Sequence, residues 1–76
     1  MDSERVERWM GIDVAKAAID VAMDAAGSVT RVPRSAEALA RWAQTVPAGT
    51  RAVVEATGGY EQRVATALRA CGIAVC

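Results

Sequence analysis

Two acidic residues, Asp13 and Glu55, each end a short apolar run and are followed by small residues. Asp13 follows residues 10–12, and Glu55 follows residues 52–54. If the two runs are neighbouring strands, they lie ~4.8 Å apart, and both carboxylates can reach one divalent cation or a close pair of cations. Magnesium prefers such hard oxygen ligands, and two metal ions can clamp the oxygens of a phosphodiester undergoing cleavage. The pair therefore predicts half of a metal-binding cluster. Two ordinary solvated acids at strand ends are the other interpretation.

Several residues beside these acids could contact a phosphate. Lys16 lies just past Asp13, where an ordinary turn lysine is equally consistent with the pattern. Thr57, Gly58 and Gly59 precede an expected helix, whose first N–H groups can hold an anion. The same glycines also suit a plain tight turn.

Other polar or reactive residues are predicted to be structural. Asp20 and Asp24 alternate with apolar residues, so they are expected on a solvated strand face rather than at a metal. Tyr60 is expected to pack in the core rather than stack on a base. Cys71 and Cys76 are expected to be small buried residues rather than nucleophiles, because the sequence has no histidine to act as a base.

The composition narrows the classes of protein. A chain of 76 residues with 53% hydrophobic residues suits one small globular domain. The formal net charge is zero, so the chain has no excess of basic residues to neutralise phosphates, which disfavours a stand-alone DNA-binding module. With two cysteines and no histidine, cysteine–histidine zinc sites are excluded. No leader-like segment and no run of ~20 apolar residues is present, so a soluble cytoplasmic protein is expected, with no membrane contact.

The hydrophobic periods predict the order β-β-β-α-β-α-β. Alternation of period two marks a strand, and spacing near 3.6 marks a helix. Residues 1–8 are expected to be flexible. The expected strands cover residues 9–13, 18–24, 28–32, 50–55 and 73–76, and the expected helices run from a Ser35 cap to Pro47 and over residues 59–71, with Thr57 as cap and Gly72 after the end.

This order predicts an α/β fold with a mixed sheet in the order 3-2-1-4-5. The first three strands form an antiparallel meander, and a right-handed crossover makes the fourth strand parallel to the first. In open α/β sheets the functional crevice lies at the carboxyl ends of the strands, where Asp13 and Glu55 both fall. The arrangement fits a partial ribonuclease H-like fold.

The two motifs also resemble a known family. GIDVAKA at residues 11–17 and EATGGYE at residues 55–61 resemble the N-terminal part of the DEDD transposases, insertion-sequence enzymes related to the Piv-type DNA invertases. The motif spacing, the helix around residues 39–42 and the glycine turns all fit, over about residues 8–76. The resemblance implies a RuvC-like, ribonuclease H-type domain, in which four acids bind Mg²⁺ and act on DNA strands. Asp13 matches the first acid and Glu55 the second.

The family's other two acids and its serine-bearing C-terminal domain would lie beyond residue 76. Residues 9–76 are therefore expected to be a truncated catalytic domain that cannot recombine DNA alone. The resemblance implies magnesium as the cofactor of the complete domain, DNA as the partner, guidance by an RNA encoded by the element, and a homo-oligomer at full length.

Two other functions fit parts of the pattern. An actin-like or sugar-kinase ATP-binding domain also opens with a strand and an aspartate, but its phosphate-gripping hairpin carries glycine and Thr or Ser just after the aspartate. Here residues 14–16 are Val-Ala-Lys, and after Asp13 the next glycine is Gly27. A non-catalytic remnant could instead associate with another protein through its exposed fifth strand. A chain that does not fold stably alone is a third possibility.

Overall fold

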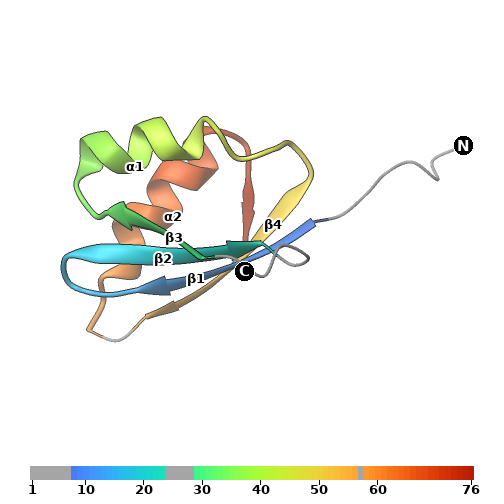
Figure 1. Ribbon diagram of the computed structural model, residues 1–76. Helices are drawn as coiled ribbons and strands as arrows, with labels where there is room; N and C mark the ends of the chain where they lie inside the picture. Colours follow the sequence, from blue (N-terminus) through green and yellow to red (C-terminus); the bar gives the residue numbers. More distant parts are fainter. Residues whose placement is uncertain (1–7, 24–28, 57) are drawn as a thin grey trace, which may run out of the picture.

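Seven elements follow the predicted order in the computed structural model, which describes residues 8–23, 29–56 and 58–76 (Figure 1). The elements are β1 (Arg8–Val14), β2 (Ala18–Met23), β3 (Val29–Pro33), α1 (Ala36–Ala43), β4 (Thr50–Ala56), α2 (Glu61–Ala70) and β5 (Ala74–Val75). The predicted β-β-β-α-β-α-β order is confirmed. Arg8, expected in the flexible N-terminus, is the first residue of β1.

The strands form one mixed sheet in the order β3-β2-β1-β4-β5, as predicted. β1 lies at its centre, antiparallel to β2 and parallel to β4. The same residue of β1, Asp13, is the register partner of Asp20 on β2 and of Glu55 on β4. The crossover through α1 therefore brings two segments far apart in the sequence into direct pairing.

Both helices cover the same face of the sheet, and the other face is left open (Figure 1). Alternate strand residues point at the helices, because side chains along a strand alternate between faces. On β1 the inward residues Met10, Ile12 and Val14 are buried. They form one core cluster with residues of the other elements, namely Ile19, Val21, Val32, Leu39, Ala43, Ala52, Val64, Leu68 and Ile73.

Helix α1 starts where the sequence predicts and stops earlier. The Ser35 hydroxyl accepts a hydrogen bond from the Ala38 N–H at 3.2 Å, so Ser35 is the N-cap. The helix ends at Ala43 rather than near Pro47. The Thr45 hydroxyl and the Thr45 N–H both donate to the Trp42 carbonyl, and these bonds tighten the chain into a turn. Trp42 nevertheless still packs against the core, as its helical spacing predicts.

Helix α2 is shorter at both ends than residues 59–71. It begins at Glu61 with Tyr60 in the N-cap position, and Tyr60 makes no side-chain capping bond. The predicted cap, Thr57, lies outside the described residues. Gly72 has a φ of 77°, and the Ile73 N–H returns to the Leu68 carbonyl, which confirms the predicted glycine after the helix end.

The prediction of buried cysteines is wrong, because Cys71 and Cys76 are both exposed. The helix ends at Ala70, so Cys71 belongs to the turn after α2 and leaves the apolar stripe that Val64 and Leu68 form. Cys76 follows the two-residue strand β5 at the edge of the sheet, where no described element covers it.

Candidate functional site

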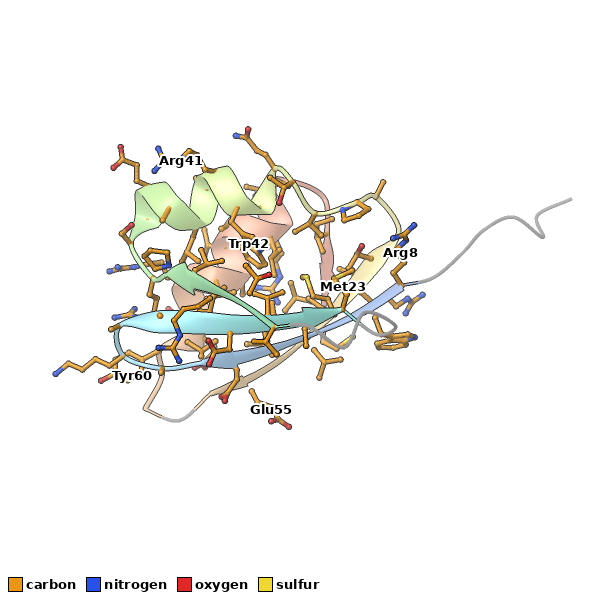
Figure 2. The ribbon with its side chains drawn as sticks, viewed as in Figure 1. Arg8, Met23, Arg41, Trp42, Glu55 and Tyr60 are labelled. Carbon is orange, nitrogen blue, oxygen red and sulfur yellow. The ribbon has the colours of Figure 1, made fainter. Side chains whose placement is uncertain are left out.

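The structure brings Asp13 and Glu55 side by side on the open face of the sheet. They are register partners near the carboxyl ends of the adjacent parallel strands β1 and β4. Both residues are exposed, whereas Ile12 and Val14 on either side of Asp13 are buried under the helices. Figure 2 shows Glu55 projecting from the sheet on the side opposite α1 and α2. With strands ~4.8 Å apart, the two carboxylates can approach a shared cation.

A shallow groove of about 470 Å³ contains this acid pair. Its other lining residues are mostly small or apolar, and they come from the four strands β1 to β4, namely Gly11, Ile12, Asp20, Ala22, Val29 and Val53. Nothing lies within 4 Å of the position that a Gly11 side chain would take, so the floor of the groove is open there. The acids therefore stand at one end of an accessible surface rather than in a closed pocket.

A third acid, Asp20, occupies the same row across the sheet on the other side of Asp13. As predicted, it lies on the face away from the core. It is paired with Arg31, its register partner on β3, whose Nε donates to Oδ1 at 2.9 Å and whose Nη2 donates to Oδ2 at 3.2 Å. The hydrogen bonds and the charge of Arg31 hold the pKa of Asp20 below its ordinary value. Asp20 is thus paired with an arginine, whereas among the described residues neither Asp13 nor Glu55 forms an ion pair.

Acidification tests the Arg31–Asp20 pair. Because the pKa of Asp20 is lower in the folded state than the ordinary 3.8, the pair stabilises the fold above that value and loses this contribution as the pH falls through the lower, folded pKa. We expect Asp20→Asn to be slightly less stable than the parent protein at neutral pH, with the difference vanishing in acid. Urea unfolding at a series of pH values measures it. The effect is expected to be small, because the pair is exposed.

The matched control is the same substitution in an Arg31→Gln background. There Asp20→Asn should change stability little at any pH. An equal loss with and without Arg31 would contradict the assignment.

Within the described residues, no group of three or more Asp, Glu or Cys side chains is placed to hold a metal ion. The acid pair is therefore a minimal donor set of two hard oxygen ligands. It suits a cation such as Mg²⁺, which is commonly held by one or two carboxylates and completes its octahedron with water and substrate phosphates.

Three of the predicted phosphate-contacting residues, Lys16, Gly58 and Gly59, lie at the same end of the sheet as the acids. Lys16 is exposed in the connection from β1 to β2, just after Asp13. Gly58 and Gly59 lie in the connection from β4 to α2, with φ angles of 80° and 79° that favour glycine. Thr57 lies outside the described residues, and so does Asp24.

Sequence reasoning missed two arginines at this end. The guanidinium of Arg34 lies 4.7 Å from the centre of the Tyr60 ring, and its Nε donates to the Lys16 carbonyl at 2.7 Å. Arg63 on α2 donates to the Arg34 carbonyl at 3.3 Å. Tyr60 itself packs against the core, as predicted. No local sequence pattern links these residues. Their contacts join the residue after β3, the start of α2 and the β1–β2 connection, which are far apart in the sequence.

No helix in the described part of the chain is long and apolar enough to span a membrane. Comparison with models of protein families, with curated protein sequences and with solved structures finds no match to this chain.

Proposed function

We propose that Asp13 and Glu55 are the first two acids of a magnesium-dependent site that cleaves and transfers DNA strands. The observation that carries the proposal is their direct register pairing at the carboxyl ends of two parallel strands in a β3-β2-β1-β4-β5 sheet. The sheet order and the motifs around the two acids support a ribonuclease H-like, RuvC-type domain of an insertion-sequence transposase.

The two carboxylates would hold the cation, which when bound supplies Lewis-acid activation of a phosphodiester. The remaining roles belong to the chain itself. The buried neighbours Ile12 and Val14 fix β1 against the helices, and so they hold Asp13 on the open face. Val54, which packs against the core, does the same for Glu55 on β4. The acids are therefore placed by rigid strands rather than by loops, which favours a defined separation.

The same proposal sets a limit on activity. Two carboxylates fall short of a complete two-metal nuclease site, and the transposase family uses four acids. We infer that this 76-residue chain does not cleave DNA alone, and that DNA, an element-encoded RNA and further copies of the chain are partners of a complete transposase. Magnesium-dependent cleavage by the purified chain, lost in Asp13→Asn, would overturn this limit.

Manganese provides the direct test of the acid pair, because it substitutes for magnesium and broadens nearby amide signals in NMR spectra. Titration of the ¹⁵N-labelled chain with Mn²⁺ should broaden signals around residues 11–14 and 53–55 first. Asp13→Asn and Glu55→Gln should each weaken the binding at least about tenfold, since even loss of a supporting residue around a metal site costs that much.

Glu37→Gln is the control for this titration. It removes the same charge from an exposed acid in the first turn of α1, away from the sheet's open face. Manganese binding should be unaffected by this change. Broadening that persists unchanged in Asp13→Asn would rule out the acid pair as the metal site.

A further inference from the structure

A second groove, of about 590 Å³, lies between α1 and α2. Small side chains of both helices line its length, and two arginines and an aromatic ring stand among them, the residues being Arg34, Ala36, Ala40, Tyr60, Arg63 and Ala67. The groove is separate from the open sheet face that carries Asp13 and Glu55. Its size is in the range of sites that hold small molecules or segments of larger ones.

Arg34 is held in a fixed position. Its Nε donates to the Lys16 carbonyl at 2.7 Å, and its guanidinium lies over the Tyr60 ring. A guanidinium has five N–H donors, so this bond leaves its terminal nitrogens available for another acceptor. Because the Lys16 carbonyl belongs to the connection that leaves β1 just after Asp13, Arg34 is tied to the acid-bearing end of the sheet.

Arg63 stands beside Arg34, since its Nη1 donates to the Arg34 carbonyl at 3.3 Å. Among the residues that the structure describes, neither arginine forms an ion pair with an acid, and neither does Lys16. Arg31 on the open face is different, because Asp20 neutralises it. Both arginines are held by hydrogen bonds to backbone carbonyls, and Arg34 also stacks on the Tyr60 ring. Because no described acid neutralises their charges, the two guanidinium groups can bind an anion. Their planar forks match the geometry of a phosphate.

We propose that Arg34 and Arg63 bind the phosphate backbone of a nucleic-acid strand that runs past the acid-bearing end of the sheet, with Lys16 beside them. This inference rests on the proposed function, which makes a phosphodiester the substrate of the acid pair. The formal net charge of the chain is zero, so the chain as a whole does not attract a polyanion. Binding is therefore expected to depend on this local cluster.

Fluorescence anisotropy of a short labelled single-stranded DNA tests the site, in EDTA and at low ionic strength. Arg63→Ala and Arg34→Ala should each weaken binding about five- to tenfold, as expected for loss of a charge-assisted contact. Each should also reduce the slope of log K against log salt by about 0.7. Arg34→Lys, which keeps the charge and loses the planar fork, should recover part of the affinity.

The control is Arg8→Ala, which removes the same charge from an exposed residue. Figure 2 shows Arg8 and Tyr60 at opposite ends of the molecule. Its affinity should equal that of the parent chain. Equal weakening by Arg8→Ala, no binding by the parent chain, or competition by poly-L-glutamate as strong as by unlabelled DNA would each overturn the proposal.

Arg34 joins several elements, so Arg34→Ala could fail to fold; circular dichroism checks this, and the exposed Arg63→Ala then decides the question. Asp13→Asn separates this inference from the metal site. It should weaken manganese binding at least about tenfold, and it should not weaken DNA binding in EDTA. Manganese binding that is absent from the parent chain or unchanged by Asp13→Asn, together with an intact arginine effect, would contradict the acid pair alone. Manganese binding that Asp13→Asn weakens, together with no arginine effect, would contradict the arginine site alone.

Discussion

Leu68→Ala is expected to destabilise the fold by about 2–5 kcal/mol, the usual cost of removing a buried leucine side chain and leaving a cavity. Leu68 lies on α2 and is fully buried against the sheet, within the one core cluster. Domains have about 0.05–0.15 kcal/mol of stability per residue, so a chain of this length is expected to have only a few to about 11 kcal/mol. The variant should therefore unfold at much lower urea concentration, as followed by far-ultraviolet circular dichroism.

Val29→Ala is the control for this experiment. It also shortens an apolar side chain, but Val29 is 63% exposed on the open face of the sheet. Its effect should stay within about 0.5 kcal/mol, as for most surface substitutions. Similar losses for the two variants would contradict the one-sided covering of the sheet by α1 and α2.

Gly58→Ala is the substitution with the next largest expected effect. Gly58 has a φ of 80°, which costs an L-residue about 1–2 kcal/mol. An added Cβ would also lie 3.1 Å from Cε2 of Tyr60, closer than ordinary contact. Thermal unfolding should therefore show a loss of more than about 1 kcal/mol.

Two other glycines distinguish the backbone cost of a positive φ from the steric cost of the contact with Tyr60. Gly59 has a φ of 79° and free space around the Cβ position, so Gly59→Ala should show the backbone cost alone. Gly11 has neither constraint, so Gly11→Ala should be neutral or slightly stabilising. The expected ranking of losses is Gly58, then Gly59, then Gly11. A Gly58→Ala variant as stable as Gly11→Ala would exclude both causes.

The sheet and its acid pair were predictable because they depend on patterns that act over many residues. Alternation in residues 18–23 places Ile19 and Val21 on the buried face, and the structure confirms this. The strand–helix–strand order makes β4 parallel to β1, which puts Asp13 and Glu55 at the same end of the sheet, and the structure shows that they are register partners. Handedness and strand direction follow from the general sterics of the chain rather than from individual contacts.

The other contacts at this end of the sheet depend on exact placement, which periodicity does not provide. The Arg31–Asp20 pair requires the exact register of β2 against β3, which the alternating pattern of the two strands does not fix by itself. A cross-strand pair of opposite charges is nevertheless a pattern worth searching for once a hairpin is assumed. The Arg34–Tyr60 stack joins the end of β3 to the start of α2, so it needs the packing of the whole domain.

The wrong prediction that Cys71 is buried came from the expected length of the second helix. A helix continued through Cys71 would place this residue one turn beyond Leu68 on the same apolar stripe. Cys71 is instead the C-cap residue, followed by Gly72 in the left-handed region, and its side chain is exposed. Helix ends are set within a residue or two by local capping, which the hydrophobic period does not register.

The central position of β1 also has a kinetic consequence. Its pairing with β2 joins segments that are close along the chain, whereas its pairing with β4 closes a loop of roughly 40 residues, which costs more chain entropy and forms more slowly. The hairpin side of β1 can therefore form early, and Asp13 gains Glu55 as a neighbour only when β4 docks. A ligand that needs both carboxylates then binds only the fully assembled sheet, and by mass action it would lower the fraction of molecules in which β1 and β4 have separated.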